Sequence, residues 1–192
     1  MAETPSTMLS LGTRAPDFSL RNVMEDRPYS LTDTKGARAL LVMFICNHCP
    51  YVQRIMPEFK KLQDDYLSKG VKIVAINSND VTSYPQDGPT PMRELALKEG
   101  WRFPFLLDET QKVAQAYRAA CTPDFFLFDG STKLVYRGQL DDARPGNSKP
   151  VNGKDLRAAL DAVLSGKTVT VEQKPSIGCN IKWRRGNEPS YF

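Results

Sequence analysis

Two cysteines separated by two residues, Cys46 and Cys49, are the side chains of this sequence with the clearest chemical capacity. They enclose Asn47 and His48 in the segment C-N-H-C-P. A cysteine pair at this spacing can cycle between a dithiol and a disulfide, or it can supply two thiolate ligands to a metal ion. Which chemistry it performs depends on the elements that hold it and on the charges around it.

The pair is expected at a junction between a strand and a helix. Residues 39–45 form an unbroken apolar run, which predicts a strand buried on both faces. After Pro50, apolar side chains recur every three or four positions, which predicts an amphipathic helix. The members of this stripe are Val52, Ile55, Met56, Phe59, Leu62 and Tyr66. The N–H groups and the dipole of a helix N-terminus stabilise a thiolate, which is the nucleophilic form of cysteine.

The charges that are near in sequence favour the same chemistry. There is no carboxylate between Asp33 and Glu58. The basic residues of this region are Lys35, Arg38 and Arg54. Such surroundings predict a lowered pKa and high reactivity for Cys46. His48 is a candidate catalytic residue, and the alternative is an exposed histidine without a catalytic task.

Length and composition restrict the function classes. The chain has 192 residues, which suits one domain, and its formal net charge of +4 is scattered, which does not favour nucleic acid as a partner. The N-terminal residues show no secretory pattern, and no apolar run approaches the roughly 20 residues of a membrane span. We therefore expect no membrane association and a cytoplasmic location. Four cysteines do not make a disulfide scaffold at this length, so C-x-x-C is expected to be catalytic or metal-binding.

The order of the predicted elements indicates an α/β fold. A strand–helix–strand unit over residues 39–77 implies parallel strands, and a hairpin over residues 124–137 adds antiparallel ones. We predict an α/β/α sandwich with a mixed central sheet and an N-terminal β extension, as one domain over residues 1–192. Residues 1–12 are expected to be flexible, and residues 166–192 form a long C-terminal tail whose path the pattern does not predict.

A long polar loop, residues 79–91, follows the second parallel strand, residues 71–77. In α/β sheets, ligands bind at the edge where the carboxyl ends of parallel strands meet. We therefore expect this loop to form a wall of the site around Cys46. The alternative is a solvated insertion without a role.

Five sequence segments carry a resemblance to a known family. They are A-P-D-F-S-L near the start, F-I-C-N-H-C-P-Y-V around the cysteine pair, N-S-N-D-V-T-S-Y-P, C-T-P-D-F-F-L-F-D, and G-C-N-I-K-W near the end. Together they resemble the thioredoxin superfamily, and within it the peroxiredoxin-like (AhpC/TSA, redoxin) thiol-disulfide oxidoreductases. The similarity runs from about residue 11 to residue 187. It implies a thioredoxin-like fold and thiol-disulfide exchange.

The resemblance also implies roles for matching residues. Cys46 corresponds to the exposed attacking thiol, and Cys49 to the thiol that resolves the mixed disulfide. Pro123 corresponds to the family's cis-proline beside the active site. Thr122 would then offer backbone groups to an extended substrate, as in strand addition.

Three further residues and one departure complete the expected site. His48 resembles the inserted residues that help to stabilise the reduced form in some branches of the superfamily. Asn47 and Cys121 are candidate substrate contacts. Residues 39–45 lack the buried acid that thioredoxins usually keep below the second cysteine, so the proton acceptor for Cys49 is open.

Other functions fit the same cysteines less well. Peroxiredoxins place their peroxidatic cysteine in a P-x-x-x-T-x-x-C pattern, and counting back from Cys49, Cys46 and Val42 replace the threonine and the proline. A zinc site needs four ligands, and only Cys121 and Cys179 add to the pair, so a metal carrier or a non-catalytic binding module is less favoured. For those two cysteines, a small buried hydrophobe is the commoner role.

The sequence thus predicts a cytoplasmic thiol-disulfide oxidoreductase that acts on disulfides of proteins or small molecules. The reducing partner would be a thioredoxin or glutathione system. We expect no cofactor and no metal, and a monomer or homodimer. The substrate and the direction of electron flow are not predicted.

Overall fold

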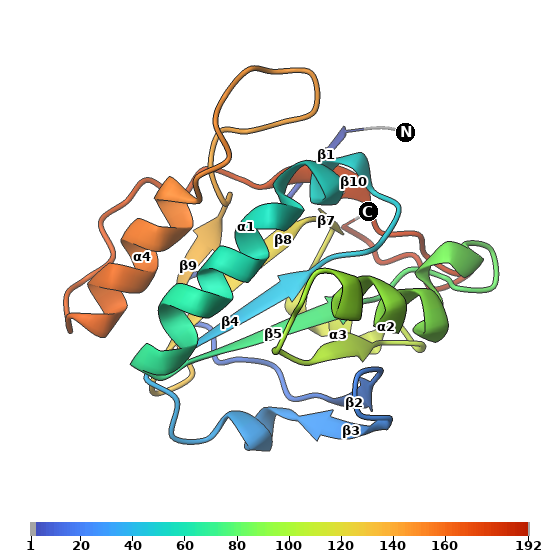
Figure 1. The fold of residues 1–192 in the computed structure, drawn as a ribbon, viewed down its shortest axis with the longest axis horizontal. Helices are drawn as coiled ribbons and strands as arrows, with labels where there is room; N and C mark the ends of the chain where they lie inside the picture. The colour runs from blue at the N-terminus through green and yellow to red at the C-terminus, as the bar shows by residue number, and fades with distance from the viewer. Residues whose placement is uncertain (1–2, 192) are drawn as a thin grey trace.

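A seven-stranded mixed sheet forms the centre of the computed structural model, which describes residues 3–191 (Figure 1). The strands lie in the order β3 (Arg27–Ser30), β2 (Ser19–Asn22), β6 (Phe105–Leu107), β5 (Val71–Asn77), β4 (Ala39–Phe44), β8 (Asp124–Asp129) and β9 (Leu134–Gly138). The strands β4, β5 and β6 are parallel, and the other neighbours are antiparallel. The predicted mixed sheet is confirmed, and β2 with β3 forms its N-terminal extension.

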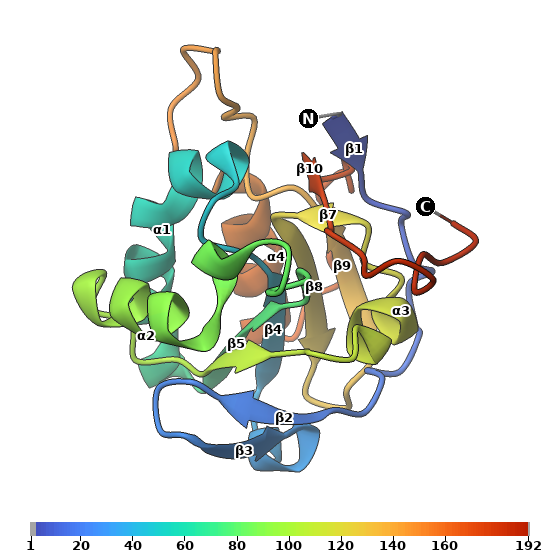
Figure 2. The ribbon, with the colours of Figure 1, turned by 90° about the vertical axis from the view of Figure 1, so that its right-hand side faces the viewer.

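Helices cover both faces of this sheet (Figure 2). One face packs against α1 (Pro50–Tyr66), α2 (Pro89–Lys98) and α4 (Lys154–Leu164), and the other against α3 (Lys112–Tyr117). The six residues of β4 are all buried, and they alternate between the two apolar cores. Leu41 and Met43 face the α1 side, whereas Leu40 and Val42 face the α3 side. This arrangement is the predicted α/β/α sandwich.

The helix after the cysteine pair begins where the sequence predicts. Pro50 is its first residue, where a missing N–H costs no intrahelical hydrogen bond. The predicted apolar stripe is buried along the helix. Glu58 is also buried there, and its Oε1 accepts a 2.8 Å hydrogen bond from Nε of Arg157 in α4. Among residues 3–191, no helix combines the length and the hydropathy that a bilayer span requires.

A second sheet brings both ends of the chain to the cysteine pair. The strand β10 (Ile177–Asn180) lies between β1 (Glu3–Pro5) and β7 (Cys121–Thr122) and is antiparallel to both (Figure 2). The predicted flexibility of residues 1–12 is therefore wrong for residues 3–5, because a strand from the far end of the chain pairs with them. Residues 1–2 and 192, the outermost parts of the predicted flexible segment and tail, lie outside the described residues.

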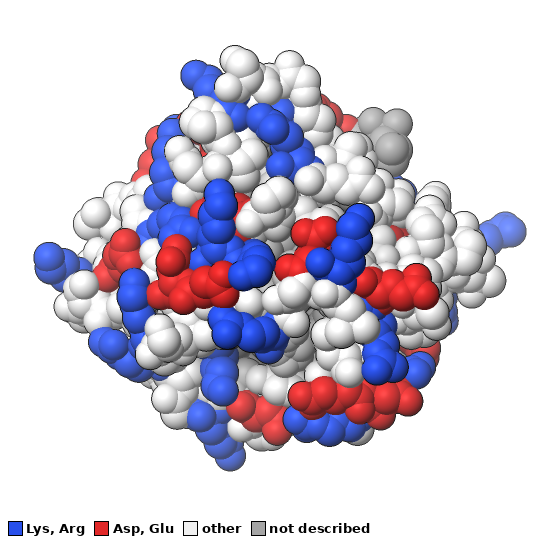
Figure 3. Space-filling model, viewed as in Figure 1, with Lys and Arg blue, Asp and Glu red and all other residues white. Residues whose placement is uncertain are grey.

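Basic and acidic side chains are intermixed on the face shown in Figure 3. Ion pairs along α1 are one cause of this mixing. They join Lys60 and Arg102 to Asp64, and Arg157 to Glu58 and Asp65. The scattered charge predicted from the sequence is what this face displays.

A buried ion pair joins β8 to β9. Nη2 of Arg137 lies 2.8 Å from Oδ2 of Asp124, and both side chains are 0% exposed. The Arg137 guanidinium also lies 3.8 Å from the ring centroid of Phe126. Since neither charge reaches water, each depends on its partner for compensation.

We expect Asp124→Asn to lower the free energy of unfolding by about 3–5 kcal/mol, because it leaves the Arg137 charge buried without a counter-ion. Urea unfolding followed by circular dichroism measures this loss. The matched control is Asp26→Asn, which removes the partner of Arg21 in an exposed pair and should change stability little. Equal losses in the two variants would contradict the assignment.

Candidate active site

The cysteine pair lies at the predicted junction between strand and helix. The strand β4 ends at Phe44, and Cys49 is the N-cap residue of α1. All four cysteines of the chain are reduced thiols. Cys46 is only 1% exposed and Cys49 is 0% exposed. The exposed thiol expected at Cys46 is therefore wrong for this structure, because segments that are distant in the sequence pack around it.

The Thr122–Pro123 segment contacts both thiols of the pair. Its peptide bond is cis, as the resemblance implied. The Thr122 hydroxyl lies 3.3 Å from Sγ of Cys46, and the Thr122 carbonyl oxygen lies 3.1 Å from Sγ of Cys49. Strand addition of a substrate at Thr122 does not fit this arrangement, because β10 already pairs with β7 and places Cys179 opposite Thr122.

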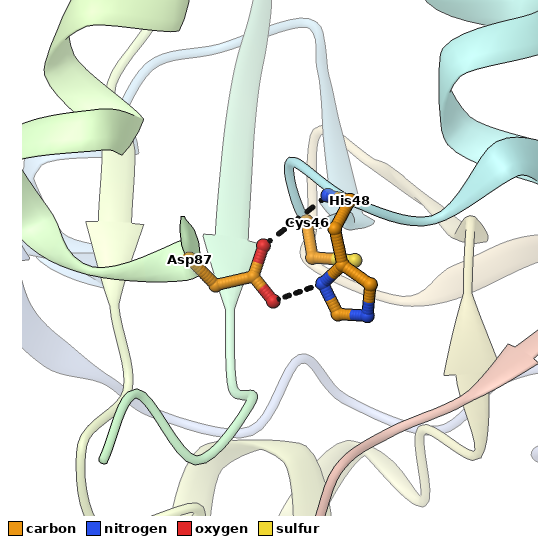
Figure 4. A group of neighbouring side chains, drawn as sticks. All are labelled: Cys46, His48 and Asp87. Atoms are coloured by element: carbon orange, nitrogen blue, oxygen red, sulfur yellow. Dashed lines mark hydrogen bonds and ion pairs between the residues drawn. The ribbon is translucent and has the colours of Figure 1, made fainter. Parts of the chain in front are cut away.

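Asp87 is the main site residue that sequence reasoning missed. Its Oδ1 accepts hydrogen bonds from the backbone N–H of Asn47 (2.8 Å) and of His48 (3.3 Å). Its Oδ2 lies 2.6 Å from Nδ1 of His48, as Figure 4 shows, and accepts a 2.8 Å bond from Nδ2 of Asn79. These bonds tie the loop of residues 79–91 to the segment between the cysteines, so its predicted position beside the site is confirmed.

The sequence held a partial signal for this carboxylate. The predicted loop contains two aspartates, Asp80 and Asp87, and its position at the sheet edge was expected. Asp80 instead accepts a 2.7 Å bond from the Ser83 hydroxyl within the loop. Tyr84 of the same loop stacks on the His48 ring, with 5.3 Å between centroids. The fold of the loop, rather than its composition, determines that Asp87 and not Asp80 binds the turn between the cysteines.

Cys121, a predicted substrate contact, is directed elsewhere. Its Sγ lies 3.6 Å from the carbonyl oxygen of Pro123 and 4.0 Å from that of Ser176. Successive side chains of a strand point to opposite faces, so the Thr122 side chain meets Cys46 and the Cys121 side chain does not. A direct substrate contact at Cys121 is therefore not supported.

The surroundings shift the pKa values of the two thiols in opposite directions. A hydrogen bond from Cys46 to Cys49 is the largest cause: it raises the pKa of Cys46 well above its usual value and helps to lower the pKa of Cys49 to about 5. Burial and the charge of Asp87 raise the pKa of Cys46 further. Burial opposes the lowering of the pKa of Cys49, whereas the nearby Cys179 thiol supports it. The predicted low pKa of Cys46 is wrong, because the neighbouring Cys49, burial and, third, the carboxylate of Asp87 all raise it.

Cys46, His48 and Asp87 also bring three potential metal-ligand atoms within 4.8 Å of one another. The Asp87 oxygens already accept hydrogen bonds from the backbone, His48 and Asn79. Protein zinc sites use four ligands, or three and a water. The group therefore fits a hydrogen-bonded cluster better than a metal centre.

We expect one thiolate per chain to form as the pH rises through about 5, because the neighbouring thiols of Cys46 and Cys179 stabilise a negative charge on the Cys49 sulfur. Ultraviolet absorbance of the thiolate measures this titration. Cys46→Ala removes the main donor and should raise the pKa of Cys49 toward 9, whereas Cys121→Ala should leave it unchanged. Because folding lowers this pKa, its stabilising contribution is present at high pH and is lost as the pH falls through about 5. A wild-type titration near 9 would refute the assignment.

A second expectation concerns Asp87. Asp87→Asn should lower the pKa of Cys46, because it removes a negative charge that disfavours the thiolate. Alkylation of Cys46 at neutral pH should then become faster, as measured by fragmentation of the alkylated peptide. Asp80→Asn changes a carboxylate of the same loop and is the control. Unchanged or slower labelling of Cys46 in Asp87→Asn alone would count against this role.

Comparison with known proteins agrees with this geometry. The family model for Redoxin matches residues 10–156. The thiol-disulfide oxidoreductase ResA of Geobacillus thermodenitrificans is 30% identical over 139 residues, which cover 71% of this chain and 75% of the relative. ResA of Bacillus anthracis is 26% identical over 127 residues, covering 66% and 68%. The expected class of enzyme, a thiol-disulfide oxidoreductase, is confirmed at this general level.

Solved structures extend the similarity to nearly the whole chain. An uncharacterized conserved protein from Geobacillus kaustophilus is 54% identical with a TM-score of 0.94, covering 96% of this chain and 97% of that one. A hypothetical protein from Sinorhizobium meliloti 1021 is 51% identical with a TM-score of 0.93, covering 95% and 100%. A thiol:disulfide interchange protein of the thioredoxin family from Chlorobium tepidum TLS, at 20% identity and a TM-score of 0.62, shares the fold over 81% of this chain and 99% of its own. With its fold, its cysteine pair and its cis-proline in agreement, this chain belongs to the redoxin family of the thioredoxin superfamily.

Proposed function

We propose that Cys46 and Cys49 cycle between a dithiol and a disulfide and thereby exchange disulfides with proteins or small molecules. The observation that carries this proposal is a pair of reduced thiols at the start of α1, both in contact with the cis Thr122–Pro123 segment. Their mutual interaction raises the pKa of Cys46 and lowers the pKa of Cys49 to about 5. A pair that already carries one thiolate at neutral pH needs no other base to start disulfide exchange. The names of the ResA relatives support the same general chemistry.

The interaction between the two thiols suggests an order of steps. Cys46 attacks one sulfur of the substrate disulfide while its proton passes to Cys49, and the first substrate thiolate leaves. Cys49 then gives up the proton and attacks the Cys46 sulfur of the mixed disulfide, which releases the second substrate thiolate. The pair loses two electrons and becomes a disulfide, and the substrate disulfide gains them. The proton ends on a released thiolate or in the solvent.

Asp87 and His48 are proposed to position the attacking cysteine. Asp87 holds the N–H groups of Asn47 and His48, and so fixes the turn that carries Cys46. A ring nitrogen of His48 lies within 4.8 Å of Sγ of Cys46, and the His48 side chain is partly exposed. A substrate would therefore meet His48 before it reaches the buried thiol. We further propose a thioredoxin or glutathione system as reductant and the cytoplasm as location, both on the basis of the sequence.

Trapping the mixed disulfide tests the proposal. With glutathione disulfide as probe, Cys49→Ser should accumulate a glutathione adduct on Cys46, because the resolving thiol is missing. The wild-type chain should release glutathione and form the Cys46–Cys49 disulfide. Intact mass and peptide mapping measure both products. An adduct on Cys121, or a wild-type pair that stays reduced, would refute the proposal.

The same chain can be tested for the competing peroxidase function. Because Val42 and Cys46 replace the proline and threonine of the peroxidatic pattern, oxidation of the pair by hydrogen peroxide should be slower than its exchange with the disulfide probe. Stopped-flow fluorescence or quenched alkylation compares the two rates at equal concentrations. A faster reaction with peroxide would make the peroxidase the better assignment.

A further inference from the structure

The C-terminal tail places a third cysteine beside the active-site pair. The strand β10 pairs with β7 so that Cys179 lies opposite Thr122 and Asn180 lies opposite Cys121. Residues directly opposite each other in an antiparallel pair project to the same face. Thr122 uses that face to contact Cys46, at 3.3 Å between its hydroxyl and Sγ. Strand geometry therefore directs Cys179 toward the pair.

The close approach of β10 depends on Gly178. A Cβ added to this residue would lie 2.0 Å from the carbonyl oxygen of Thr122 and 2.6 Å from its carbonyl carbon. Both atoms belong to the backbone next to the cis peptide bond, so they cannot move aside as a flexible side chain would. Only a glycine at this position lets β10 bring Cys179 this near to the pair.

Cys179 lies in the same buried cluster as Cys46 and Cys49. The Cys179 thiol donates a hydrogen bond to the Cys49 sulfur, and this bond contributes to the low pKa of Cys49 and raises the pKa of Cys179 to about 12. Cys179 is 3% exposed, so external reagents reach it poorly. Cys49 thus has two neighbouring thiols, those of Cys46 and Cys179.

We propose that Cys179 is a third redox-active thiol that receives the disulfide from Cys46. Resting on the proposed function, the step starts from the Cys46–Cys49 disulfide. The Cys179 sulfur attacks the Cys49 sulfur, the Cys46–Cys49 bond breaks, and a Cys49–Cys179 bond forms. The leaving Cys46 thiolate takes up the proton that Cys179 loses. The exchange is internal, so it needs no oxidant or reductant, and it returns Cys46 to the form that attacks a substrate.

Tryptic peptides separate the two disulfides cleanly. Cleavage after Arg and Lys places Cys46 and Cys49 together in residues 39–54, and Cys179 in residues 168–182, because Lys174 precedes a proline and is not cleaved. A Cys46–Cys49 bond therefore stays within one peptide, whereas a Cys49–Cys179 bond joins two peptides. Cys121 lies in residues 119–133, so a link to Cys121 would also be recognised.

The experiment oxidises the full chain with glutathione disulfide, quenches it with acid, alkylates it and maps the peptides without reduction. In the wild type we expect the link between residues 39–54 and 168–182 to appear after the Cys46–Cys49 disulfide and at its expense. In Cys46→Ser this link should become the main product. Cys121→Ser should form it as the wild type does, whereas Gly178→Ala should lose it and retain the Cys46–Cys49 disulfide, because β10 is displaced.

The outcomes separate this inference from the proposed function. One outcome is that the wild type forms the Cys46–Cys49 disulfide, while Cys179 is still fully alkylated after unfolding in both the wild type and Cys46→Ser. This outcome would refute a redox role for Cys179 and leave the proposed function intact. If the wild type forms no Cys46–Cys49 disulfide, both fail. A link from residues 39–54 to residues 119–133 would assign the role to Cys121 instead.

Discussion

The site depends on the position of Thr122 relative to the end of β4. The Thr122 hydroxyl contacts Cys46, and its carbonyl oxygen contacts Cys49. This position is set by the central sheet, because Phe44, at the end of β4, pairs with Asp124, at the start of β8. The residues that follow β4, which carry the cysteines, therefore lie beside Thr122 and Pro123, which precede β8. One antiparallel strand pair brings both sides of the site together.

Opposing electrostatic effects then give the two thiols different pKa values. The N-terminus of α1 favours a thiolate, and Cys49 is the N-cap residue of this helix. Burial and the carboxylate of Asp87 disfavour a thiolate at Cys46. A shared proton satisfies both conditions, since the buried pair then holds one negative charge rather than two. Asp87 is itself held by backbone N–H groups, so it fixes the turn between the cysteines at the cost of a higher pKa for Cys46.

The tail occupies one edge of β7. In the position where an added substrate strand was expected, the chain supplies its own strand, β10, and Gly178 permits its close contact with Thr122. The same strand pairs with β1, so this sheet joins residues 3–5 to residues 177–180. Cys46 and Cys49 are buried, with Thr122 in contact with both and Asp87 bound to the turn between them.

The sequence by itself determined the elements whose pattern is local. The apolar run before Cys46 predicted β4, the stripe after Pro50 predicted α1, and together they located the cysteine pair at a helix N-terminus. The order of strands and helices predicted the mixed sheet and put the loop of residues 79–91 at the edge of the site. These predictions succeeded because hydrophobic period and chain order constrain secondary structure and topology directly.

Only the tertiary structure decided which groups surround the thiols. Asp87 lies 40 positions from Asn47, and Thr122 lies 76 positions from Cys46, so no local pattern connects them. The pKa of a thiol depends on every charge, hydrogen bond and layer of burial near it, and most of these come from distant segments. For that reason the sequence did not predict the raised pKa of Cys46. For the same reason it left Cys179 without a location, although strand pairing brings it into contact with Cys49.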